Sequence, residues 1–171
     1  MTRTRTITWH DPAETAALSH GLNGLEILHR ISSGLIPGPP AAALVGFEPT
    51  YVMPGRVVFA YEPREEHYNP LGTVHGGILT TVLDTVMGCA VQSLLDAGVV
   101  YVTIELKTSF VRAVTLATGP LRAEGTVVHP GSRVSTAEAK LLDEAGRLYA
   151  HATSTLLVKS GEARAEAPLA A

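Results

Sequence analysis

The stretch from Gly77 to Leu95 constrains the fold more than any other part of this sequence. It is 19 residues long and weakly polar, and Asp84 is its only charged residue. A lone membrane span would hold fewer hydrogen-bonding side chains than this segment does, so we predict a buried central helix. Because such a helix is apolar on most of its faces, other elements must cover it from several sides. The hydrogen-bonding residues are Thr80, Thr81, Thr85, Gln92 and Ser93.

A loop of turn-forming residues leads into this helix and includes Asn69, His75, Gly76 and Gly77. The first turn of a helix offers unpaired backbone N–H groups and a favourable dipole to a developing negative charge. Glycine also lets a ligand approach the backbone closely. The sequence therefore predicts an oxyanion donor at the N–H of Gly76 or Gly77. The alternative is that the two glycines serve only the tight turn into the helix.

Asp84 is the predicted general base or nucleophile. Its helical neighbours one turn away are Thr80, Thr81 and Gly88, which are small and leave room beside the carboxylate. An aspartate in an apolar helix needs a partner or a task, because it loses hydration there. The structural alternative is a buried carboxylate that Thr80 or a hydroxyl of a partner chain merely holds in place.

Composition narrows the class of protein. The 171 residues fit one domain, and 46% of them are hydrophobic. The formal charge of −3 comes without a basic stripe, so we expect no nucleic-acid partner. No apolar run follows the charged amino end, which predicts a cytoplasmic protein without a secretory signal. Cys89, the single cysteine, is expected to be a small core residue.

Metal and nucleotide chemistry are not expected. The nearby metal-ligand types are His67, His75 and Asp84, and the spacing of the two histidines fits no compact ligand helix. The glycines at 72, 76 and 77 lack the Lys-Ser/Thr of a phosphate-binding loop. We therefore expect neither a metal ion nor another cofactor.

The pattern of apolar residues divides the chain into three parts. Two short helices are expected at 13–20 and 25–35, and the run Pro37-Gly38-Pro39-Pro40 ends this helical arm of residues 1–40. The domain proper, 41–159, begins with two strands at 42–46 and 55–62 around a turn region at 49–54. Strong alternation predicts a half-buried strand at 101–110 after the helix. An antiparallel meander at 121–129, 133–142 and 147–158 follows, and then a flexible tail at 160–171.

These elements predict an α+β fold in which a curved antiparallel sheet wraps around the long helix. The sequence resembles the hotdog-fold acyl-CoA thioesterases, and among them the phenylacetyl-CoA-thioesterase-like (PaaI-like) family. The resemblance covers roughly residues 40–158. It rests on the pattern Asn69-Pro70-x-Gly72-x-x-His75-Gly76-Gly77, on Asp84 nine residues after the histidine, and on the strand at 103–112 and the hairpin between 131 and 147.

The resemblance also implies roles for individual residues. Asn69 would hold the attacking water or orient the acyl group, and His75 would lie at the thioester sulfur or brace the loop. Thr103 would help to place the water near the aspartate. The remaining residues would bind substrate, with the last three facing the CoA nucleotide or pyrophosphate: Gly77, Thr81, Gly88, Arg112, Ser132 and Arg133. For the asparagine and the histidine, ordinary turn and loop-bracing roles stay open.

The spacing of Gly76 and Asp84 predicts an assembly. Eight residues of helix separate them by about 12 Å, which is too far for one reacting carbon to touch both. If the two residues act together, they come from different subunits related by a two-fold axis. We therefore expect a homodimer with two shared active sites, and the resemblance adds a dimer of dimers (a homotetramer) as an option.

The sequence thus predicts an acyl-CoA thioester hydrolase with no membrane partner. The alternatives are an acyl-CoA-binding module without turnover and a hotdog hydratase or dehydratase acting on acyl thioesters. Aryl, short aliphatic and medium-chain acyl groups all fit the small residues near Asp84.

Overall fold

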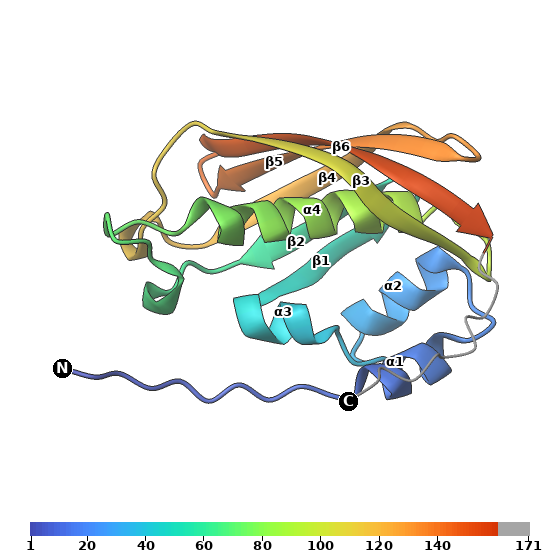
Figure 1. The fold of residues 1–171 in the computed structure, drawn as a ribbon, viewed down its shortest axis with the longest axis horizontal. Coiled ribbons are helices and arrows are strands. Elements are labelled where there is room, and N and C mark those ends of the chain that lie inside the picture. Colours follow the sequence, from blue (N-terminus) through green and yellow to red (C-terminus); the bar gives the residue numbers. More distant parts are fainter. Residues whose placement is uncertain (161–171) are drawn as a thin grey trace.

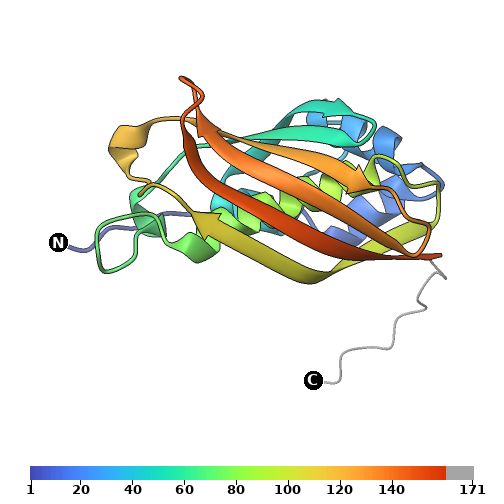
Figure 2. The same ribbon diagram turned by 90° about the horizontal axis from the view of Figure 1, so that it is seen from above.

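A six-stranded antiparallel sheet and one long helix, α4, form the centre of the molecule (Figures 1 and 2). The structure is a computed structural model, and it describes residues 1–160. In chain order the elements are α1 (Pro12–Ser19), α2 (Gly24–Ser32), α3 (Pro40–Val45), β1 (Phe47–Met53), β2 (Arg56–Tyr61), the 3-10 helix η1 (Glu65–His67), α4 (Gly76–Gln92), β3 (Val99–Phe110), the 3-10 helix η2 (Leu116–Thr118), β4 (Leu121–His129), β5 (Val134–Asp143) and β6 (Leu148–Ser160).

The strand order is β1-β2-β4-β5-β6-β3, with every neighbouring pair antiparallel. The predicted meander is confirmed for β4, β5 and β6. Strand β3 precedes them in sequence but pairs with β6, so it occupies one edge of the sheet while β1 occupies the other.

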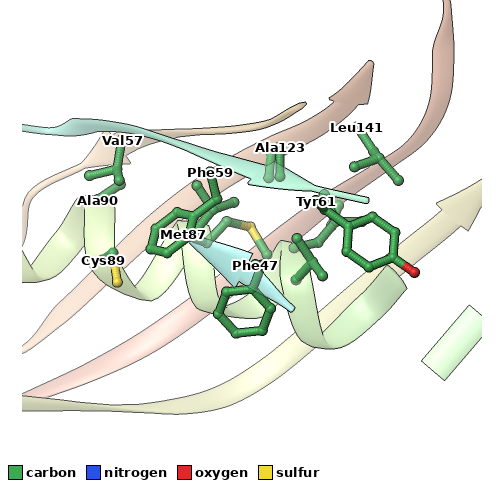
Figure 3. Packing of buried hydrophobic residues seen from close by; sticks show 14 of the residues in the cluster. Phe47, Val57, Phe59, Tyr61, Met87, Cys89, Ala90, Ala123 and Leu141 are labelled. Atoms are coloured by element: carbon green, nitrogen blue, oxygen red, sulfur yellow. The ribbon is translucent and has the colours of Figure 1, made fainter. Parts of the chain in front are cut away.

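The sheet curves around α4, and the predicted hotdog architecture is confirmed (Figure 1). The middle of α4 is buried, and Val82, Val86 and Met87 are among its fully buried residues. Phe59 from β2 and Leu141 from β5 belong to the same core (Figure 3). Apolar burial of about 25 cal/mol per Å² on both sides of the helix is the main term that holds this arrangement together.

One glycine shows how closely the sheet approaches the helix. A Cβ atom added to Gly125 of β4 would lie 2.5 Å from the carbonyl oxygen of Val86, so only glycine fits there without a shift.

Cys89 is buried in α4, as predicted for a core residue, and burial raises the pKa of its thiol to about 12.

The predicted strand at 42–46 is wrong, because α3 occupies this segment. Pro40 lies in the first turn of α3, where its missing N–H costs nothing, and Gly46 ends the helix in the left-handed conformation with a φ of 79°.

The predicted turn region at 49–54 is also wrong. Residues 47–53 form β1, and Pro49 is tolerated at an edge strand beside a register shift. The real turn is short and is centred on Pro54 and Gly55.

The face assignment of β3 differs from the expectation of a regularly alternating, half-buried strand. Val102 and Ile104 are exposed by 49% and 57%, while Tyr101 and Thr103 face α4. A bulge at Ile104 breaks the period of two, and a position at the sheet edge leaves these apolar side chains uncovered.

Helix α2 packs against β1 and the far end of α4, and α3 packs against β1 (Figure 1). In α2, a capping box joins Asn23 and Glu26, and the N–H of Gly24 donates to the carbonyl of Leu95 at 3.0 Å. The arm boundary at residue 40 stays a prediction. Of the predicted tail, Ser160 ends β6, and residues 161–171 lie outside the described part of the chain. Within residues 1–160, no helix is both long and apolar enough to cross a bilayer.

Candidate active site

His75 caps the amino end of α4. Its Nδ1 atom accepts a hydrogen bond from the N–H of Gly77 at 2.9 Å, so the Gly77 donor is occupied. The carbonyl of His75 accepts from Ile78 at 2.9 Å. The loop-bracing alternative for this histidine is therefore observed, and its proximity to a thioester sulfur stays a prediction.

The N–H of Gly76 is the donor that remains at this helix start. Within residues 1–160 no acceptor lies within hydrogen-bonding distance of it, as expected for the first residue of a helix. A Cβ atom at Gly76 would lie 2.8 Å from Cζ of Phe110 on β3. Glycine at this position leaves room for the ring of Phe110 and adds no side chain beside the backbone N–H.

A cavity of about 290 Å³ opens beside this donor. Asn69, Gly76 and Arg112 all line it, so three of the predicted site residues come together here. Apolar groups complete the wall: Val74, Leu79, Phe110, Val111, Ala113 and Val114. An unpaired backbone donor in a cavity lined by both polar and apolar groups is a suitable place for a carbonyl that gains negative charge.

Asn69 is engaged by its own loop. Its Oδ1 atom accepts from the N–H of Leu71 at 2.9 Å, and its Nδ2 donates to the hydroxyl of Thr73 at 3.0 Å. These bonds form a local turn of the kind that asparagine favours. Gly72 supports the turn with a φ of 77°. The predicted role of Asn69 toward water or the acyl group stays a prediction.

Asp84 lies farther along α4 and is half-buried. The hydroxyl of Thr103 on β3 donates to its Oδ1 at 2.9 Å, so the two residues are in direct contact. The predicted placement of a water molecule by Thr103 stays a prediction. The hydroxyl of Thr81 is occupied within the helix, where it donates to the carbonyl of Gly77 at 3.0 Å. A carboxylate with one threonine donor keeps acceptor capacity for a water molecule.

Tyr101 fills the space beside Gly88 that the sequence suggested would be open. A Cβ atom at Gly88 would lie 2.5 Å from the tyrosine hydroxyl oxygen. Burial raises the pKa of Tyr101, and electrostatic interactions with Cys89 and Asp84 raise it further. A substrate contact at Gly88 stays a prediction and requires the tyrosine to move.

The three predicted CoA-binding residues lie at two ends of the sheet. Arg112 follows β3 near the start of α4 and donates to the carbonyl of Leu148 at 2.5 Å. Ser132 and Arg133 are exposed in the turn between β4 and β5, at the opposite end. Each end of one protomer therefore carries only part of the predicted site.

Sequence reasoning missed a buried tyrosine–histidine pair behind the loop. The hydroxyl of Tyr61 and Nδ1 of His67 are 2.9 Å apart, and the rings stack at 5.8 Å. The carbonyl of His67 accepts from the N–H of His75 at 2.8 Å, which ties the pair to the cap of α4. A histidine at the end of a polar run gave no sign of this contact, because its partner comes from another element.

His67 is 5% exposed, and within residues 1–160 its Nε2 has no hydrogen-bond partner. Burial lowers the pKa of His67, and the nearby Arg64 and Arg5 lower it further against the opposing charge of Glu66. The folded protein therefore holds this imidazole neutral. In the same part of the chain, no cluster of three or more His, Cys, Asp or Glu side chains could hold a metal ion.

Comparisons with known proteins place the chain in a family. The model of the thioesterase superfamily matches residues 71–150. A Saccharolobus solfataricus protein, provisionally described as an esterase, is 36% identical to this chain over 98 residues. The aligned region covers 57% of this chain and 68% of that protein.

Two solved structures extend the comparison. A Ralstonia eutropha protein, provisionally named a thioesterase related to phenylacetic acid degradation, has a TM-score of 0.70 and 30% identity, covering 76% of this chain and 98% of that one. A Streptococcus mutans protein solved with acetyl CoA bound has a TM-score of 0.62 and 24% identity, covering 67% and 90%. The chain belongs to the thioesterase superfamily of hotdog-fold proteins, and the predicted resemblance is confirmed. Its general activity is that of a thioester hydrolase.

The lowered pKa of His67 predicts how stability depends on pH. Below the ordinary histidine pKa of 6.5, the unfolded chain binds a proton that the folded chain excludes. The stabilisation is therefore complete above pH 6.5 and is lost as the pH falls through the folded pKa, with a slope of at most about 1.4 kcal/mol per pH unit. Urea unfolding at several pH values should show a shallower acid-side loss for His67→Gln than for wild type. His151→Gln, at an exposed position, should keep the wild-type slope, and equal slopes in all three proteins would contradict the prediction.

Proposed function

We propose that this protein hydrolyses acyl-CoA thioesters to a carboxylic acid and free CoA. The observation that carries the proposal is the pair of groups on α4: an unpaired Gly76 N–H at its start, and the Asp84 carboxylate, held by Thr103, two turns later. Thioester hydrolysis needs a donor for the carbonyl oxygen and an activated attacker, and it needs little help for the thiolate that leaves.

The Gly76 N–H polarises the carbonyl and then stabilises the oxyanion as the tetrahedral intermediate forms. His75 keeps the neighbouring Gly77 donor occupied, so the geometry favours Gly76 over Gly77. Asp84 removes a proton from the attacking water, or it attacks the carbonyl itself. In both routes collapse of the tetrahedral intermediate expels the CoA thiolate, which takes up a proton. In the second route this step leaves an acyl-aspartate anhydride, which water then hydrolyses.

The two groups act across a subunit boundary. Along α4 they are about 12 Å apart, so one thioester carbon cannot meet both within a single chain. Strand β3 has a free edge, and exposed Val102 and Ile104 lie on it, which are the features of a strand that pairs with a second copy.

The position of the proposed two-fold axis follows from two contacts of β3. Thr103 touches Asp84, and Phe110 covers Gly76. Antiparallel pairing of β3 with its copy, centred between residues 106 and 107, sets Thr103 of one protomer opposite the partner's Phe110. Asp84 then approaches the partner's Gly76, and each dimer holds two composite sites.

The same symmetry joins the two halves of the proposed CoA site. Arg112 lies at one end of the sheet, and Ser132 and Arg133 lie at the other, so a two-fold axis brings the arginine toward the partner's turn. The Streptococcus mutans protein has the same fold and holds acetyl CoA, which supports a CoA thioester as the ligand class. Arginines and free turn amides are suitable partners for the pyrophosphate.

Substitution of Asp84 tests the attacking group. We expect Asp84→Asn and Asp84→Ala to lower kcat by about 100-fold or more, because the base or nucleophile is lost. Release of free thiol, followed spectrophotometrically over a panel of aryl, short and medium-chain acyl-CoAs, gives the rates. Asp96→Asn, an exposed acid beyond α4, should keep wild-type turnover. Unchanged kcat in the Asp84 variants would contradict the assignment of Asp84 as base or nucleophile. A wild-type protein that is inactive on the whole panel would favour a binding module.

A proline tests the Gly76 donor. Proline removes the N–H yet suits the first helical position, and His75 already has the extended conformation that a following proline requires (φ −61°, ψ 133°). Gly76→Ala adds a similar Cβ against Phe110 but keeps the donor. We expect Gly76→Pro to lower kcat about 100-fold below Gly76→Ala, with circular dichroism confirming folding. Equal rates in the two variants would remove Gly76 from the reaction.

A heterodimer tests the shared site. One chain carries Asp84→Asn and the other Gly76→Pro, each with a different affinity tag, and two successive affinity steps isolate the mixed dimer. If each site takes Asp84 from one chain and Gly76 from its partner, one of the two sites is intact, and turnover is about half that of wild type. If each site lies within one chain, both sites are defective and turnover stays at the level of the inactive parents.

A further inference from the structure

A second cavity lies away from α4, between the amino-terminal arm and the β1–β2 edge of the sheet. Its volume is about 610 Å³, and it shares no lining residue with the cavity at Gly76. Hollows of 300–1,000 Å³ are typical of small-molecule sites. Much of its wall is apolar and comes from Trp9, Pro39, Ala42, Phe47, Ala60 and Pro120.

Ion pairs hold the arm beside this cavity. Arg3 pairs with Glu65, and Arg5 pairs with Glu66 at 2.7 Å, so the arm is attached to η1. Arg5 also donates to the carbonyl of Leu44 at the end of α3, at 3.3 Å. These contacts keep the segment that carries Trp9 alongside α3 and close one side of the hollow.

Arg64 is the polar group that selects a ligand. Among residues 1–160, two arginines are half-buried: Arg122 donates to Glu124 and to the carbonyl of Asp143, whereas Arg64 has no acceptor within hydrogen-bonding distance. Its guanidinium lies against Gly46, where a Cβ atom would be 2.5 Å from Cζ. A guanidinium that lines a cavity and has no protein acceptor keeps its donors free for a ligand carboxylate.

The charges at the rim limit the ligand further. Glu48 and Glu62 line the cavity with exposed side chains, and neither forms an ion pair with Arg64. Two carboxylates near the entrance disfavour a polyanion such as CoA by like-charge repulsion. One carboxylate can still form a bidentate pair with the guanidinium while an apolar body covers Phe47 and Trp9.

We propose that the cavity beneath the amino-terminal arm is a second binding site, separate from the hydrolase site, for a small apolar monocarboxylic acid whose carboxylate pairs with Arg64. Its apolar part lies against Trp9 and the floor formed by α3 and β2. Acids of this class are also what the hydrolase would release, and that correspondence alone rests on the proposed function.

Trp9 is the single tryptophan of the chain and is 63% exposed, so its fluorescence reports on this cavity directly. Titration of the full-length protein with octanoate or phenylacetate should give a saturable blue shift as the ligand covers the indole. Octanol, which lacks the charge, should bind at least 10-fold more weakly. Arg64→Gln should weaken octanoate binding at least 10-fold, and Arg30→Gln, at an exposed arginine outside both cavities, should leave it unchanged.

Two further variants distinguish binding in this cavity from binding elsewhere on the protein. Ala60→Leu, which fills the cavity and keeps Arg64, should also abolish the shift, with thermal melting used to confirm that each variant folds. Asp84→Asn should bind octanoate as wild type does, whether or not the protein hydrolyses acyl-CoA. The proposal is overturned if wild type shows no saturable shift, if Arg64→Gln binds as tightly as wild type, or if Asp84→Asn abolishes binding and so locates the acid at the hydrolase site.

Discussion

The burial of α4 against the curved sheet is the constraint from which the other features follow. Because the sheet needs a core and the helix needs cover, the two are stable only together, and Gly125 lets their backbones approach within contact distance. This packing fixes the direction of the helix. Its first turn, capped by His75, therefore opens at one end of the sheet, while Asp84 faces Thr103 on the edge strand.

The loop before α4 is held by bonds that reach in both directions along the chain. The carbonyl of His67 accepts a hydrogen bond from the N–H of His75, and the His67 ring contacts Tyr61 on β2. The ring of His75 accepts a hydrogen bond from the N–H of Gly77. The donor at Gly76 lies between these fixed points and, within residues 1–160, makes no hydrogen bond of its own. Such preorganisation is what an oxyanion donor requires, since it need not reorient as charge develops.

Sequence alone predicted the central helix and the loop that enters it, because apolar length and turn chemistry are local signals. It singled out Asp84 and Thr103 separately, and their direct hydrogen bond is a finding of the structure. It failed at α3, where the preference of proline for a helix start outweighed a short apolar run. It also missed the bulge at Ile104 and the Tyr61–His67 contact. The bulge depends on how β3 pairs with β6, and strand pairing is a long-range property that periodicity does not encode. The contact depends on how the chain turns between β2 and η1, which the apolar pattern does not encode either.

The attachment of the arm has a thermodynamic consequence of its own. Its two ion pairs with η1 are largely solvent-exposed, and pairs of this kind contribute at most about 1 kcal/mol each and weaken as ionic strength rises. The α4 core relies instead on apolar burial, which salt does not screen. The segment that carries Arg3 and Arg5 can therefore detach while α2, which packs Leu28 into the core, stays in place. The hold of this segment on the residues just before His67 responds to the electrolyte around the protein.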